Sequence, residues 1–132
     1  MTCVLPTHRL LASDRCGWKV CELIDGAVHL VLGIPGLIFS REDFLIFVEL
    51  LDVADGPLPS CDVTLARASP TRAICYLIAH ERLVVQFDQC LISIRPNDFA
   101  LLAALSRKAL TALDVPPIGA DMLVLQGCSR WN

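Results

Sequence analysis

The chain has 132 residues, of which 55% are hydrophobic and 19% charged, and its formal net charge is −3. This length suits one domain, residues 1–132, whose core needs no disulfide or metal, and the apolar excess excludes a disordered chain. The acidic balance leaves no basic field for nucleic acid or an anionic membrane, so neither is expected as a partner.

Cysteine usage and hydropathy indicate the compartment. The seven cysteines are odd in number and irregularly spaced, which favours free thiols in a reducing environment over a disulfide framework. No stretch reaches the eighteen or so apolar residues of a membrane span, and the N-terminal segment lacks the apolar region of a signal peptide. A cytoplasmic protein is therefore expected.

The first half of the chain, residues 17–56, reads as a β-β-β-α unit. Asp25-Gly26 stands between two β-rich runs and is typical of a tight hairpin. Placing Ile24 opposite Ala27 across that turn predicts two cross-strand pairs, Glu22 with His29 and Val20 with Val31.

A third strand and a helix complete this unit. Pro35-Gly36 favours a turn before a strand over residues 37–39. Ser40 suits the N-cap of a helix, Glu42 places negative charge in its first turn, and Gly56 followed by proline ends it.

Adding 55 to these positions reproduces the pattern over residues 73–113. His80-Glu81 falls at the hairpin, and Pro96 falls at the first position of the second helix. Residues 57–72 are a linker or an edge strand, and the N-terminal segment and the segment after residue 113 are arms, the latter with a possible final strand. The sequence thus predicts an α+β fold of antiparallel β-meanders with two helices, as pseudo-duplicated β-β-β-α units.

The distribution of apolar side chains supports this repetition, because residues alternate between the two faces of a strand. The predicted apolar face of the first unit keeps its character after the shift by 55. It carries Cys21, Leu23, Val28, Leu30, Leu32, Leu37 and Phe39, which become Tyr76, Ile78, Leu83, Val85, Phe87, Ile92 and Ile94. The alternative is that two amphipathic meanders happen to be equally spaced.

The opposite sheet face is less polar than a solvated antiparallel sheet would be, which indicates a covered or contacted surface. The first helix is apolar nearly all round, so it too is expected to be buried on more than one side. The candidate interaction surface comprises Trp18, Val20, Glu22, His29, Val31, Phe47, Leu77 and Val84. Either the two terminal arms or a protein partner would cover it.

Catalytic and metal-binding signatures are weak. Cys16 and Cys21 are the nearest approach to a metal-ligand pair, but their spacing is not that of a zinc site, and no cofactor is expected. Glu22 beside His29 would make a general base, although no nucleophile motif accompanies the pair.

The sequence therefore favours a non-enzymatic protein that works through protein contacts, as an accessory, adaptor or chaperone-like subunit, and that forms a homodimer. The alternative is a small-ligand or metal-binding protein that uses a pocket between sheet and helices or the cysteine thiols.

Overall fold

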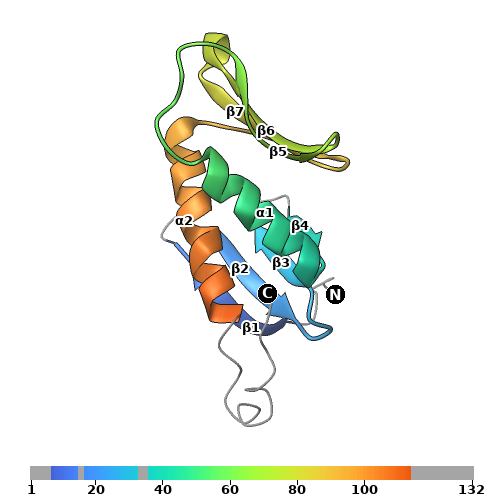
Figure 1. Cartoon of the computed structure of the whole chain (residues 1–132). Helices are drawn as coiled ribbons and strands as arrows, with labels where there is room; N and C mark the ends of the chain where they lie inside the picture. Colours follow the sequence, from blue (N-terminus) through green and yellow to red (C-terminus); the bar gives the residue numbers. More distant parts are fainter. Residues whose placement is uncertain (1–6, 15–16, 33–35, 114–132) are drawn as a thin grey trace. The chain divides into compact units, whose positions relative to one another are not determined.

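The computed structural model describes residues 7–14, 17–32 and 36–113. A first antiparallel sheet contains, in sequential order, β1 (Thr7–Ser13), β2 (Lys19–Leu23), β3 (Val28–Val31) and β4 (Gly36–Phe39), and is followed by α1 (Arg41–Ala54). A second sheet contains β5 (Val63–Ser69), β6 (Arg72–Leu77), β7 (Arg82–Phe87) and β8 (Cys90–Ile94), with a one-turn 3₁₀ helix η1 (Ile78–His80) before β7, and is followed by α2 (Pro96–Leu113) (Figure 1). The expected α+β class with duplicated β-meanders is confirmed.

Each repeat has one strand more than the β-β-β-α unit of the prediction. We call β1–β4 with α1 the first repeat, and β5–β8 with α2 the second repeat. The extra strands are β1, in the segment expected to be an arm, and β5, in the segment expected to be a linker or edge strand. The repeated unit is therefore β-β-β-β-α.

The two extra strands share an irregularity that supports the repetition. Leu10 pairs with Cys21 and Ala12 with Val20, so that Leu11 forms a bulge in β1. In β5 the bulge lies at Leu65, and a shift of 54 relates Leu11, Ala12 and Cys21 to Leu65, Ala66 and Cys75. A bulge at the same place in both repeats is a specific structural feature, which chance spacing of strands would not reproduce.

The β2–β3 hairpin has a three-residue loop. The N–H of Leu23 donates to the carbonyl of Ala27 over 2.8 Å, and the N–H of Gly26 donates to the carbonyl of Leu23 over 2.9 Å. Gly26 has φ 93°, the left-handed conformation that closes a turn of this length with a bulge. The predicted register is wrong by one residue, because Cys21 and not Glu22 faces His29.

The corresponding loop of the second repeat is one residue longer. Leu77 pairs with Arg82 across η1, and Glu81 takes the left-handed conformation with φ 50°. This extra residue changes the shift between the repeats from 54 before the loop to 55 after it.

The one-residue error exchanges the two faces of β2. Val20 and Glu22 lie on the core-facing side of the first sheet together with Val28, whereas Cys21 lies on the outer side with His29. The faces predicted for the strands of the second sheet are correct, but Ile78, expected on the core-facing side, lies in η1 and is 39% exposed. The core-facing side of this sheet carries Ile74, Tyr76, Leu83, Val85, Phe87, Ile92 and Ile94.

The chain forms two compact units that do not coincide with the repeats. One unit comprises the first sheet and α2 from Leu105 onward, and the other comprises residues 41–104, which include α1 and the second sheet. Fully buried Val20, Val28 and Leu30 lie in the first unit.

Helix α1 lies against β5 and β6 in the second unit. Its buried residues form one broad face and are Phe44, Phe47, Val48, Leu50, Leu51 and Ala54. The ring of Phe47 meets that of Phe87 edge-on, with 5.7 Å between centroids, and Phe47 is fully buried. Phe47 is therefore a core residue and not part of a surface. Val53, on the opposite side of the helix, is 65% exposed. Within the described ranges, no helix has the length and apolarity to cross a membrane.

Candidate functional site

The observed strand register places some residues of the predicted interaction surface in the core and others on the outer side of a sheet. Val20 is fully buried in the core, so it is not available to a partner. Glu22 is 7% exposed, and its carboxylate accepts a hydrogen bond from Nε of Arg9 on β1 at 2.7 Å. Since Glu22 turns toward the core, the expected Glu22–His29 pair does not form.

His29 lies on the outer side of the first sheet, where its imidazole covers Gly36 of β4. A Cβ atom at Gly36 would come within 2.6 Å of Nε2 of His29. Glycine at this position thus leaves room for the ring. Trp18 and Val31 are half-buried, and the backbone N–H of Trp18 donates to the carboxylate of Asp14 over 3.2 Å.

The weak metal candidates are not brought into a site. Cys16 lies outside the described residues, and Cys21 is a buried free thiol. Among residues 7–14, 17–32 and 36–113, no three His, Cys, Asp or Glu side chains gather where they would hold an ion.

Arg72 forms an ionic cluster that sequence reasoning missed. Its guanidinium binds Asp88 through two hydrogen bonds of 2.9 and 2.7 Å, binds Asp43 of α1 at 3.2 Å, and lies 4.2 Å above the ring of Phe87. Thr71 also donates to the carboxylate of Asp88. These bonds raise the pKa of Arg72, and they lower the pKa of Asp88 chiefly through its hydrogen bond with Arg72. The cluster ties α1 to the second sheet, which is a structural role.

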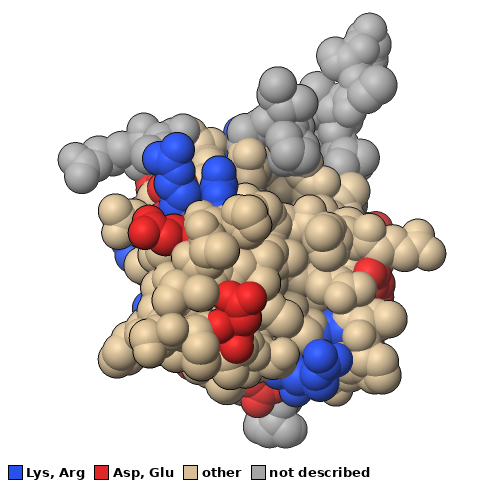
Figure 2. Space-filling view, turned by 90° about the horizontal axis from the view of Figure 1, so that it is seen from above, with Lys and Arg blue, Asp and Glu red and all other residues tan. Residues whose placement is uncertain are grey.

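The outer side of the second sheet retains two of the predicted surface residues. Leu77 and Val84 are half-buried there, and Leu91 of β8 is 67% exposed. Figure 2, which shows the molecule from above, contains small separated groups of charged residues on a largely uncharged surface. We call Cys75, Leu77, Val84, Gln86 and Leu91 the outer face of the second sheet.

The two edges of the second sheet differ. Edge strand β5 carries Arg67 and two register shifts, which are features that hinder pairing with another strand. Edge strand β8, with the sequence CLISI, pairs with β7 in regular register and contains no charge, proline or bulge. The sheet therefore has one protected and one unprotected edge.

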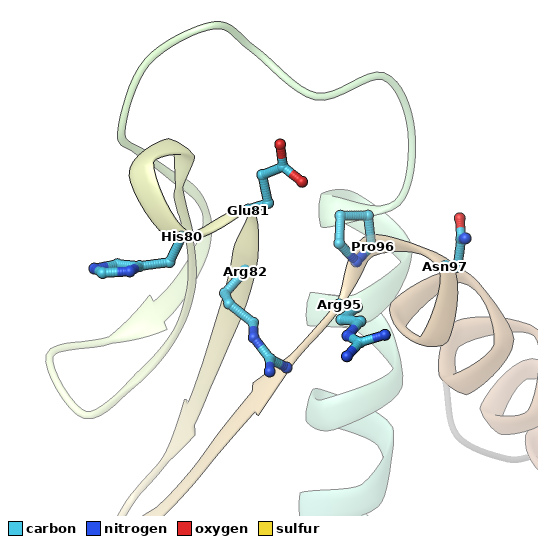
Figure 3. Close-up of a pocket in the computed structure, with 6 residues that line it drawn as sticks. All are labelled: His80, Glu81, Arg82, Arg95, Pro96 and Asn97. Carbon is cyan, nitrogen blue, oxygen red and sulfur yellow. The ribbon is translucent and has the colours of Figure 1, made fainter.

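An open hollow of about 500 Å³ lies where the β6–β7 loop meets the start of α2. Its lining comprises His80, Glu81, Arg82, Arg95, Pro96 and Asn97. Figure 3 shows the guanidinium groups of Arg82 and Arg95 directed to the same side, with the Glu81 carboxylate turned away from them. No sequence motif predicts this site, because its residues come from two separate segments of the chain.

Comparison with known proteins adds no relative. No protein-family model matches the chain, and no curated protein or solved structure is significantly similar to it. Functional inference therefore depends on the surfaces described above.

Proposed function

We propose that this protein is a non-enzymatic interaction subunit that self-associates, and that two copies meet along edge strand β8. The observation that carries the proposal is that β8 is regular, uncharged and unprotected, and borders an outer face with Leu77, Val84 and Leu91. An edge of this kind presents unpaired backbone N–H and C=O groups to any further strand.

A second copy suits this edge because the strand is self-complementary. Antiparallel pairing of β8 with itself opposes no like charges, and it extends the four-stranded sheet to eight strands about a two-fold axis. Leu91 of each copy then lies beside the other copy's outer face.

The contact is small. The five residues of β8 span only about 17 Å. Pairing along a strand of this length buries less area than the roughly 800 Å² per partner of a standard interface. We therefore expect a reversible dimer with a dissociation constant in roughly the micromolar range.

Sedimentation velocity of the untagged full chain under reducing conditions tests the proposal. We expect the sedimentation coefficient to rise with protein concentration from the monomer to the dimer value. Leu91→Lys places a charge on the edge and should keep the protein monomeric. The matched control is Val53→Lys, because Val53 on α1 is 65% exposed against 67% for Leu91. A wild-type chain that stays monomeric, or equal loss of the dimer in both variants, would contradict the proposal.

A further inference from the structure

We propose that the hollow between the β6–β7 loop and the start of α2 binds a small oxyanion of the phosphate class, held by Arg82 and Arg95. This site is independent of the β8 edge contact and represents a second activity of the chain.

The arginines occupy an unfavourable arrangement that a ligand would relieve. Leu83 and Ile94 are the last paired residues of β7 and β8, so Arg82 and Arg95 follow as the next opposed positions. Like charges opposite one another across two strands are destabilising. Among the described residues neither guanidinium has a hydrogen-bond or ion-pair partner, whereas Arg72 in the same sheet has both Asp88 and Asp43.

The first repeat shows that the fold does not need this pair. A shift of 55 relates Arg82 to Ala27 and Arg95 to Ser40, both uncharged. The β-β-β-β-α unit thus forms equally with small neutral residues there. The extra residue of the β6–β7 loop, which carries His80 and Glu81 into the lining, is also present in the second repeat alone.

The chemistry of the lining favours an anion with several oxygens. A guanidinium donates paired hydrogen bonds that match phosphate or carboxylate oxygens, and two of them suit a doubly charged group. The N–H groups of Asn97 and Asp98 precede the first hydrogen bond of α2, from Phe99 to Arg95, and lie at the positive end of the helix dipole.

Two carboxylates oppose binding, Glu81 in the lining and Asp98 in the first turn of α2. The Glu81 carboxylate is directed away from the guanidinium pair (Figure 3). The two positive charges of Arg82 and Arg95 exceed the single negative charge of the Glu81 carboxylate in the lining. The hollow therefore favours a dianion over a monoanion.

Titration with inorganic phosphate, followed by NMR of the backbone amides in a low-salt buffer, tests the site. The protein is kept dilute so that association along β8 does not contribute. We expect saturable shifts at Arg82, Arg95 and Asn97, and at least tenfold weaker binding in Arg82→Gln and in Arg95→Gln. Arg67→Gln removes the same charge from an exposed position of the same sheet and should bind as the wild type does.

A second readout separates a binding role from a structural one. Without phosphate, Arg95→Gln should unfold at the same temperature as the wild type or higher, because it removes a like-charge pair. A lower unfolding temperature would show that the guanidinium stabilises the fold and would overturn the assignment. The absence of saturable shifts, equal weakening by Arg67→Gln, or binding of acetate as tight as that of phosphate would overturn it too.

Discussion

The two repeats have the same strand order and the same bulge, yet they place their charged side chains differently. In the first repeat an ion pair, Arg9–Glu22, lies on the core-facing side of the sheet. In the second repeat the equivalent positions hold Val63 and Tyr76, and the ionic cluster around Arg72 lies at the end of the sheet instead. The backbone arrangement therefore tolerates either placement of charge, and the side-chain feature common to both repeats is apolar burial.

Substitutions in the buried faces of α1 and α2 should cause the largest losses of stability and therefore test whether the two repeats bury equivalent residues. Phe47 and Leu102 are equivalent under the shift of 55, and both are fully buried. We expect Phe47→Ala to lower the free energy of unfolding by about 3–5 kcal/mol and Leu102→Ala by about 2–5 kcal/mol, because each leaves a cavity. Urea denaturation measures both losses.

Exposed Val53 provides the control for these cavities, since Val53→Ala should change stability by less than about 0.5 kcal/mol. A loss below about 1 kcal/mol for either core variant would mean that the two helices do not share an equivalent buried position.

Removing the ion pair of the first repeat should cause the next largest loss of stability. Glu22→Ala leaves the guanidinium of Arg9 without this carboxylate, and we expect a loss of about 2 kcal/mol, less than for a fully buried pair because Arg9 is partly exposed. The double variant Arg9→Val/Glu22→Tyr carries the residues of the second repeat and should recover most of that loss. If the double variant were less stable than Glu22→Ala in thermal unfolding, the two repeats would not be interchangeable at this position.

The ionic cluster of the second repeat is expected to make the smallest contribution to the free energy of unfolding, and this contribution depends on pH. The pKa of Asp88 is lowered in the folded protein, so its ionised form contributes stability above the unfolded-state pKa. That contribution is lost as the pH falls through the lower, folded-state value, from about pH 4 downward.

Asp88→Asn keeps a residue that tolerates φ 60° and should flatten this acid dependence of the unfolding temperature. Glu49→Gln on the exposed side of α1 serves as the control for the change in charge. If the unfolding temperature of Asp88→Asn depended on acid pH as steeply as that of the wild type, the cluster would not contribute to stability.

The sequence predicts correctly which residues lie on each face of the second sheet, but it assigns the two faces of β2 wrongly. The size of the register error in each hairpin explains this difference. The expected pairing in the β6–β7 hairpin is wrong by two residues, since Leu77 faces Arg82, and such a slip leaves every side chain on its own face. The β2–β3 error is one residue, which exchanges Val20 with Cys21.

The two added strands have a different cause. The sequence predicts β5 only as one of two alternatives and does not predict β1, because bulges interrupt the alternation of apolar and polar residues in both strands. The hollow of Arg82 and Arg95 depends on the pairing of β7 with β8, which brings together residues that no local motif connects.

Hydrogen–deuterium exchange measured at two protein concentrations tests most directly whether β8 is where two copies meet. Strands β4 and β8 are each the last strand of their sheet, so neither has a further strand paired with its outward amides. We expect the amides of Cys90–Ile94 to become protected as the concentration rises through the dimer transition, while those of Gly36–Phe39 remain unchanged. Exchange of β8 that does not depend on concentration, or protection that develops in β4 instead, would contradict the account.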